Sequence, residues 1–224
     1  MAAVRLEQAS LGWHGFEGDR RYAFRRTDDK SKMPWLTASR LPELLLYQPS
    51  DPVASAGING NAIHVNTPSG RNLSLHSLEL CDELSTKLGT PLELTQLDQG
   101  IFDEAPVSII NLATISQIER EVGRSMEVLR FRPNILIESL SSEPFAEDAW
   151  VGKSLTFGTG ENCPTVSVTM LDKRCVMINL DPNTAAADAQ VMKAAVRLND
   201  NNAGVYGTVT RPGELIVGQR VFLL

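Results

Sequence analysis

Basic residues next to turns, together with one cysteine, are the residues of this sequence whose types and spacing could do chemistry. They occur in four short segments: "GDRRY" at 18–22, "TASR" at 37–40, "FRPN" at 131–134 and "KRC" at 173–175. A guanidinium group offers planar, bidentate donors that suit a phosphate or another oxygen-rich anion. Converging on one cavity, these segments would form a pocket for an anionic cofactor. For any single arginine, a solvated strand residue or an ordinary ion pair is the simpler interpretation.

Cys175 is the most informative of these positions. Positive charge on the neighbouring Lys173 and Arg174 favours the thiolate, which is the form of cysteine that ligates a metal. A thiolate is a soft ligand. The alternative, which the residues alone leave open, is a buried thiol at the start of a core strand. Cys81 falls on the apolar face of an expected helix, so we predict a packing role for it. Cys163 has no adjacent cation and precedes a proline, so we interpret it as a loop or strand-edge thiol with no special role.

The common catalytic motifs are missing from the sequence. It has no G-x-S-x-G, P-loop, G-x-G-x-x-G or H-E-x-x-H pattern, and its three histidines are scattered at positions 14, 64 and 76. The three cysteines include no C-x-x-C pair, so reduced thiols are expected. The net charge of −6 gives no general reason to bind nucleic acid. These observations disfavour histidine-based zinc sites, Cys-His nucleophiles and polyanion partners.

Composition indicates a water-soluble globular protein. Of the 224 residues, 42% are hydrophobic and 21% are charged, and the longest apolar runs are far too short to cross a bilayer. The N-terminal segment has no continuous apolar core of a secretory signal. The expected location is therefore the cytoplasm, with no membrane partner.

Short β-favouring runs between turn residues dominate the chain, and three segments have helical spacing. The helices are expected at 77–89, 108–123 and 188–199. Strands are expected at 20–26, 35–40, 41–49, 57–75 (as a hairpin), 129–139, 154–158, 164–171 and 203–224. The predicted fold class is mainly β (α+β), a β-barrel-like core with short helices at its periphery.

The order of these motifs resembles one known family. The stretch from "KRCVMINLDP" to "RPGELIVG" is similar to the C-terminal half of a MOSC domain, and "FRPNILIE" followed by "FAEDAWVGKSLTFG" is similar to its middle. The N-terminal "LEQASLGWHGFEGDRRYAF" and "LTASRLPELLLY" resemble the β-barrel domain that precedes MOSC in amidoxime-reducing enzymes. The resemblance implies a shortened N-terminal MOSC-associated domain over 1–95, without the usual first Lys-Ser turn, and a MOSC domain over 96–224.

The resemblance also implies a cofactor and the residues that hold it. The cofactor is the molybdenum–pyranopterin group (Mo-molybdopterin), with Cys175 as the protein ligand to the metal. Arg20, Arg132 and Asn134 match positions that hold the pterin and its phosphate. Lys173 and Arg174 border the metal ligand. The turn of Thr37, Ser39 and Arg40 is a weaker candidate for the pocket wall.

Three functions are compatible with this resemblance. The first is a molybdenum-dependent oxidoreductase that reduces small N-hydroxylated or N-oxide substrates with electrons from a separate donor protein. The second is a non-catalytic carrier of the cofactor, or of sulfur on Cys175. The third is a barrel that binds no cofactor. The dispersed cysteines cannot supply the four thiolates of an iron–sulfur cluster, so the electron donor is expected to be a separate protein.

Overall fold

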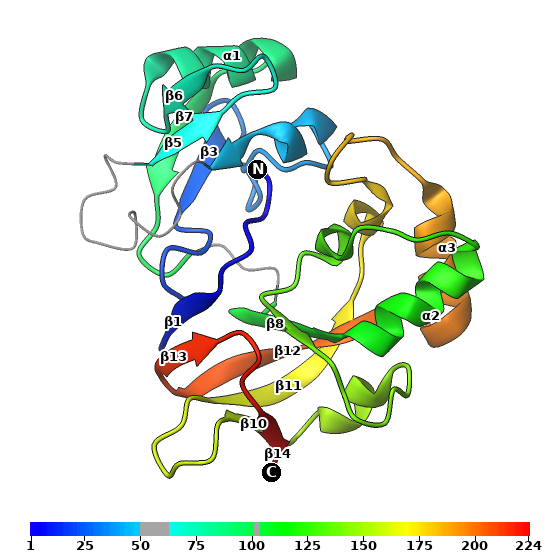
Figure 1. The fold of residues 1–224 in the computed structure, drawn as a ribbon. Coiled ribbons are helices and arrows are strands. Elements are labelled where there is room, and N and C mark those ends of the chain that lie inside the picture. Colours follow the sequence, from blue (N-terminus) through cyan, green and yellow to red (C-terminus); the bar gives the residue numbers. More distant parts are fainter. Residues whose placement is uncertain (50–62, 101–103) are drawn as a thin grey trace. The chain divides into compact units, whose positions relative to one another are not determined.

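A computed structural model describes residues 1–49, 63–100 and 104–224 and divides the chain into two compact units (Figure 1). The first unit comprises Met1–Val4, Gly18–Ile101 and Pro182–Ala186. The second comprises Arg5–Glu17, Phe102–Asp181 and Ala187–Leu224. Each unit therefore contains segments that are distant in sequence. The expected domain boundary between residues 95 and 96 stays a prediction.

A six-stranded sheet forms the framework of the second unit. Its strand order is β14-β10-β11-β12-β8-β9, and every neighbouring pair is antiparallel except β8 with β9. The strands are β8 (Val107–Asn111), β9 (Ile135–Ile137), β10 (Ser154–Phe157), β11 (Thr165–Lys173), β12 (Asn202–Arg211) and β14 (Val221–Leu223). The sheet curls like half of a barrel (Figure 1). The predicted fold class, mainly β with peripheral helices, is confirmed.

Irregular pairing explains why this sheet curls. The register of β11 against β12 shifts at three places, the last between Leu171 and Lys173. Such irregularities bend a strand and increase its twist. Apolar residues of β8, β10, β11 and β12 form one core cluster, including Val107, Val166 and Val205, which have no exposed surface.

Two helices pack against each other in the second unit, α2 (Leu112–Val122) and α3 (Ala189–Asn199), and Figure 1 shows them side by side. The Asn111 side chain caps α2 by accepting a hydrogen bond from Ala113 N, and the left-handed Gly123 ends the helix. The expectation of a helix from residue 108 is wrong for its first four residues. Ser108–Asn111 belong to β8, because all five side chains of that strand are buried within the sheet.

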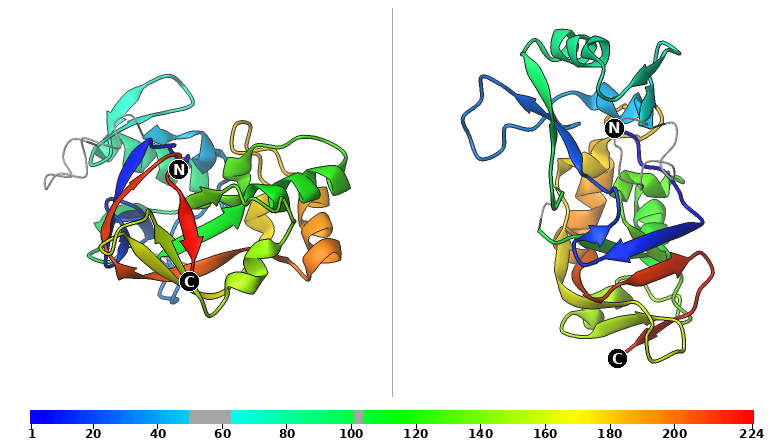
Figure 2. Two further views of the ribbon diagram at one scale, coloured as in Figure 1. Left: turned by 60° about the horizontal axis from the view of Figure 1, so that its bottom comes forward. Right: turned by 90° about the vertical axis from the view of Figure 1, so that its left-hand side faces the viewer.

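A smaller sheet in the second unit joins both ends of the chain. Its order is β13 (Gly213–Ile216), β1 (Gln8–Gly12) and β2 (Gly15–Phe16), all antiparallel. Figure 2 shows the blue β1 running beside the red β13. The pairing of Gln8 with Ile216 thus ties the N-terminal segment to the C-terminal one.

The first unit contains a two-stranded and a three-stranded sheet. Strand β3 (Tyr22–Arg26) pairs with β7 (Leu92–Gln96), and β4 (Gln48–Pro49), β5 (His64–Asn66) and β6 (Asn72–Ser74) form the other sheet. The expected hairpin is confirmed in β5 and β6, while its residues 57–62 lie outside the described part of the chain. The expected helix is α1 (Leu78–Leu88), capped by Ser77 and Gly89.

Of the strands expected at 35–40 and 41–49 in the first unit, only Gln48–Pro49 form one, β4. Pro42–Leu46 form a 3₁₀ helix, η1, instead of a strand, with Leu44 and Leu45 buried. Within 35–40, Trp35 makes only an isolated bridge to Arg25, and the following residues form a turn. Proline at the start of η1 suits a helical first turn, and it lacks the N–H that a central strand would need. Across the described ranges of both units, none of the helices combines the length and apolar character needed to span a membrane.

Candidate functional site

Cys175 lies where the long strand β11 leaves the sheet. The strand ends at Lys173, and Cys175 precedes a 3₁₀ turn, η6 (Val176–Asn179). The thiol is free and the residue is exposed. The alternative of a buried thiol at the start of a core strand is therefore wrong. The sulfur is accessible to a ligand from solvent.

Arg174 points into the protein although the next residue is exposed. Its Nε donates to Ala203 O (2.6 Å) and one Nη donates to Phe131 O (2.6 Å). The other Nη lies 2.9 Å from the Asp172 carboxylate. Burial lowers the pKa of Arg174, and the charge of Asp172 opposes this shift. Two of its nitrogens are thus held by hydrogen bonds, and the third lies in an ion pair without meeting hydrogen-bond geometry.

Asn134 belongs to the same buried polar network. Its Oδ1 accepts a hydrogen bond from Ser108 N (3.0 Å), and its own N donates to Ser108 O (2.8 Å). Ser108 Oγ in turn donates to Asp172 (3.3 Å), the partner of Arg174. The structure therefore brings Asn134 and Arg174 together through two residues that the sequence did not single out, Ser108 and Asp172.

The segment expected to be one strand over 129–139 is divided. Val128–Phe131 form a 3₁₀ helix, η4, and only Ile135–Ile137 are a strand. Arg132 ends η4 in the left-handed conformation (φ 49°), with its N–H donated to Leu129 O, and is half-buried. Because a left-handed residue interrupts a strand, the prediction of one continuous strand over 129–139 is wrong.

Arg130 is a buried arginine that the sequence did not single out. It is 2% exposed and donates to the carbonyl oxygens of Ile178 (3.2 Å) and Asn179 (2.7 Å). Its other Nη lies 2.9 Å from Asp181. Arg130 thus holds the chain immediately after Cys175. Arg130 and Arg132 are two residues apart in a segment with an alternating pattern, and this pattern was the only sequence signal for a buried arginine. The pattern alone does not tell which arginine faces inward.

Four predicted site residues lie in the first unit. Thr37 and Ser39 share a hydrogen bond between their hydroxyl groups (2.8 Å), and Arg40 N donates to Thr37 O (3.0 Å). These three residues form one turn, with Ser39 and Arg40 exposed. Arg20 has a left-handed backbone (φ 54°) and lies 3.8 Å from the Asp19 carboxylate. In the second unit, the remaining candidate, Lys173, is exposed and pairs with Asn202.

The donor atoms near Cys175 fit the cofactor that the resemblance implies. Among residues 1–49, 63–100 and 104–224, no group of three or more His, Cys, Asp or Glu residues could hold a bare metal ion. A metal bound through Cys175 would therefore need other ligands of its own, as a dithiolene cofactor provides. The exposed thiol suits such a soft metal, and the exposed Lys173 adds positive charge beside it.

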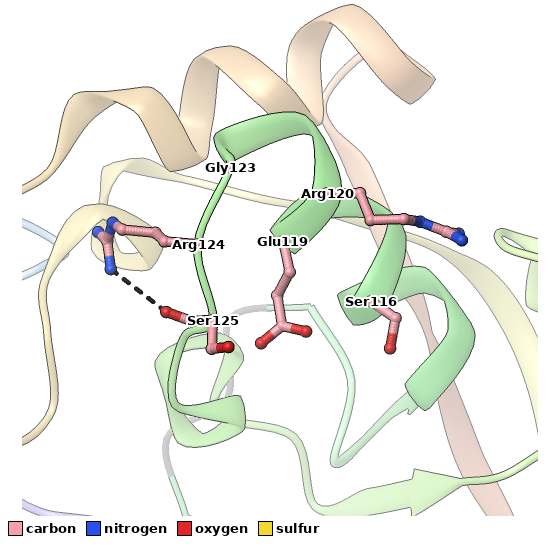
Figure 3. Close-up of a pocket in the computed structure, with 6 residues that line it drawn as sticks. All are labelled: Ser116, Glu119, Arg120, Gly123, Arg124 and Ser125. Atoms are coloured by element: carbon pink, nitrogen blue, oxygen red, sulfur yellow. Dashed lines mark hydrogen bonds between the residues drawn. The ribbon is translucent and has the colours of Figure 1, made fainter.

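A shallow pocket lies elsewhere on the second unit, along the C-terminal half of α2 and the turn after it (Figure 3). Its lining residues are Ser116, Glu119, Arg120, Gly123, Arg124 and Ser125. Arg124 is paired with Asp188, and Glu119 accepts a hydrogen bond from Met126 N. None of the predicted site residues lines this pocket, so it supports no part of the candidate site.

Glu147, in the 3₁₀ helix η5 (Ala146–Trp150), is a fully buried carboxyl group. It accepts hydrogen bonds from Thr114 Oγ1 (2.8 Å) and Asn111 N (3.2 Å). Burial raises the pKa of Glu147, although these hydrogen bonds oppose the shift. The side chain ties η5 to the start of α2.

This raised pKa predicts a pH-dependent stability. The folded pKa lies above the unfolded value of about 4.5, so the contribution of Glu147 is full below that pH and falls as pH rises through the folded pKa. Glu147→Gln removes the titration. Urea unfolding from pH 4 to 8 should therefore show the free energy of unfolding of wild type falling relative to the variant, by up to about 1.4 kcal/mol per pH unit. The exposed Glu138→Gln is the control, and parallel curves for wild type and Glu147→Gln would contradict the assignment.

Comparison with known proteins identifies the family. Two relatives are mitochondrial amidoxime-reducing components: component 2 of Bos taurus is 28% identical over 134 residues (54% of this chain, 37% of that protein), and component 1 of Homo sapiens is 24% identical over 135 residues (54% and 38%). The matched region thus spans less than two fifths of either relative. The solved YUAD protein from Bacillus subtilis covers 97% of this chain and 85% of that chain at 12% identity and a TM-score of 0.49. The MOSC domain family matches residues 64–222, more than half of the sequence, and the chain therefore belongs to this family.

Proposed function

We propose that this protein binds the molybdenum–pyranopterin cofactor through Cys175 and reduces small N-hydroxylated or N-oxide substrates. The observation that carries the proposal is that Cys175 is free and exposed, between the buried Arg174 and the η6 turn that Arg130 binds. Membership of the MOSC family and the similarity to amidoxime-reducing components support it.

The reaction breaks the N–O bond of the substrate. Two electrons and two protons are consumed, and the oxygen leaves as water. The nitrogen of an N-hydroxylated substrate gains a hydrogen in place of its hydroxyl group, and the nitrogen of an N-oxide regains its lone pair. The cofactor, when bound, supplies the oxygen-accepting and redox chemistry. The electrons come from a separate donor protein, and the location proposed for the reaction is the cytoplasm.

The residues of this chain contribute binding and orientation. Cys175 supplies the sulfur ligand. Arg130 holds η6, the turn that follows it, and the side chain of Arg174 is anchored in the interior, each through carbonyl oxygens. Lys173 offers an exposed positive charge beside the thiol. Pterin or phosphate contacts by Arg20, Arg132 and Asn134, and a wall role for Thr37, Ser39 and Arg40, remain proposals that rest on the family resemblance.

Replacing the proposed ligand tests the function directly. Protein made in a cofactor-producing host should contain about one molybdenum per chain, and Cys175→Ser should lose most of it, because a hydroxyl group is a poor substitute for a thiolate. Metal analysis by plasma mass spectrometry measures this content. Cys163→Ser is the matched control, since its sulfur accepts a hydrogen bond from Gly160 N in the second unit. Full molybdenum content in Cys175→Ser would refute the ligand assignment.

A carrier function is the second candidate, and the exposure of the Cys175 thiol favours it equally. A carrier would hold the cofactor, or a sulfur atom as a persulfide, for delivery to another protein. Stable loading without turnover of any hydroxylamine or amidoxime, with a competent chemical reductant present, would identify the carrier. If protein from the same host contained neither molybdenum nor pterin, the third function, a barrel that binds no cofactor, would be supported instead.

A further inference from the structure

Asn201 makes two hydrogen bonds to the backbone of Arg174, the residue before Cys175. Arg174 N donates to Asn201 O (2.9 Å), and Asn201 Nδ2 donates to Arg174 O (2.6 Å). The pairing of β11 with β12 ends one step earlier, at Lys173 with Asn202. Asn201 therefore extends the β11–β12 pairing by one residue, using its side-chain amide where a strand would use a backbone N–H.

Asn201 adopts an unusual backbone conformation to do this. Its φ is 75° and that of the preceding Asp200 is 47°, so two consecutive residues other than glycine are left-handed. Such residues are uncommon, and strained backbone tends to cluster at functional sites. Asn201 N also donates to Ala195 O (3.2 Å), which anchors it to the end of α3. The segment before the thiol is thus connected to a helix through this one residue.

The side chain of Asn201 has a cost that a glycine would avoid. Its Oδ1 is buried and accepts no hydrogen bond among the residues described in the structure. Glycine would adopt the left-handed backbone more easily and would bury no amide. The Asn201 side chain donates a hydrogen bond to the Arg174 carbonyl oxygen, and this bond explains why the position holds asparagine instead of glycine.

We propose that Asn201 is a positioning residue for Cys175. Its amide fixes the peptide group between Arg174 and Cys175, and this directs the thiol outward for metal ligation. The inference rests on the proposed function, in which Cys175 binds molybdenum. Asn201 does not touch the metal and acts only through the backbone of its neighbour.

The test compares Asn201→Gly with Asp200→Gly in the full chain. Both variants place glycine at a left-handed position, but only the first removes the bond to Arg174 O. In cofactor-free protein, amide hydrogen exchange of the segment 174–178 should be roughly fivefold faster in Asn201→Gly, as expected for the loss of one hydrogen bond. In loaded protein, X-ray absorption at the molybdenum edge should show less protein sulfur bound to the metal. Both readouts should match wild type in Asp200→Gly.

The hydrogen exchange and the molybdenum–sulfur signal together test whether Asn201 positions Cys175. Unchanged exchange and an unchanged molybdenum–sulfur signal in Asn201→Gly would overturn the inference, as would equal changes in both variants. Faster exchange together with a weaker sulfur signal in Asn201→Gly alone would support it. If wild type takes up no molybdenum, the proposed function fails, and hydrogen exchange then decides by itself whether Asn201 holds the Cys175 segment.

Discussion

Arg174→Ala should destabilise the protein by about 3–5 kcal/mol, as is typical when one partner of a buried ion pair is removed. Asp172 is 2% exposed, and its buried charge would lose the guanidinium group that lies 2.9 Å away. The carbonyl oxygens of Ala203 and Phe131 would also lose their donors. Chemical denaturation monitored by circular dichroism measures the change.

Two further variants separate charge from packing at this position. Lys173→Ala removes an exposed cation one residue away and should change the free energy of unfolding by no more than about 0.5 kcal/mol. Combining Arg174→Ala with Asp172→Asn should recover part of the lost stability, because the buried carboxylate that Arg174 balances is then replaced by a neutral amide. A cost below about 1 kcal/mol for Arg174→Ala alone would refute the buried ion pair.

Gly204→Ala should destabilise the protein by about 2–5 kcal/mol. Gly204 lies in β12 with φ 94°, and an added Cβ would lie 2.6 Å from Ile109 O and 2.9 Å from an Arg174 Nη atom. The left-handed backbone costs roughly 1–2 kcal/mol for other residues. Overpacking adds a further ~1–3 kcal/mol. Thermal unfolding measures the combined effect.

Gly218 provides a matched control for this substitution. Its φ is 81°, and an added Cβ would meet no atom within 4 Å. Gly218→Ala therefore carries the backbone strain without the close approach. If both variants lower the melting temperature equally, the close approach of the added Cβ to Arg174 and Ile109 does not contribute to the destabilisation, and our account of Gly204 is wrong.

Local signals were sufficient to predict several elements of the fold. Helix α1 begins after Ser77 and ends before Gly89, as its capping residues indicate. The segments 154–158 and 164–171 form strands as expected, β10 and β11. In these elements the hydrophobic pattern and the turn residues agree, so the sequence alone determines the element.

Other elements depend on tertiary packing that no local pattern contains. Ser108–Asn111 have apolar residues that suit a helix or a strand equally well, and their full burial in the sheet decides for the strand. The apolar run at Pro42–Leu46 folds as a 3₁₀ helix with two leucines buried. Short apolar runs of this kind are ambiguous until their neighbours are known.

The candidate site could be predicted in part. The sequence marks Cys175 as a possible ligand, but its exposure depends on where β11 ends. Arg174 and Lys173 are adjacent cations with equivalent sequence signals, yet the first is buried and the second exposed. Asn201 and Arg130 act on the Cys175 segment through backbone oxygens. Many polar residues could have this role, and no sequence motif predicts it.

The parallel pairing of β8 with β9 also has a consequence for the order of folding. The hydrogen bond from Ser108 to Asn134 closes a chain loop of 26 residues, whereas the bond from Ser108 to Asp172 closes one of 64. Shorter loops lose less entropy on closure. We therefore expect the segment 131–134 to dock on β8 before the segment that carries the thiol does.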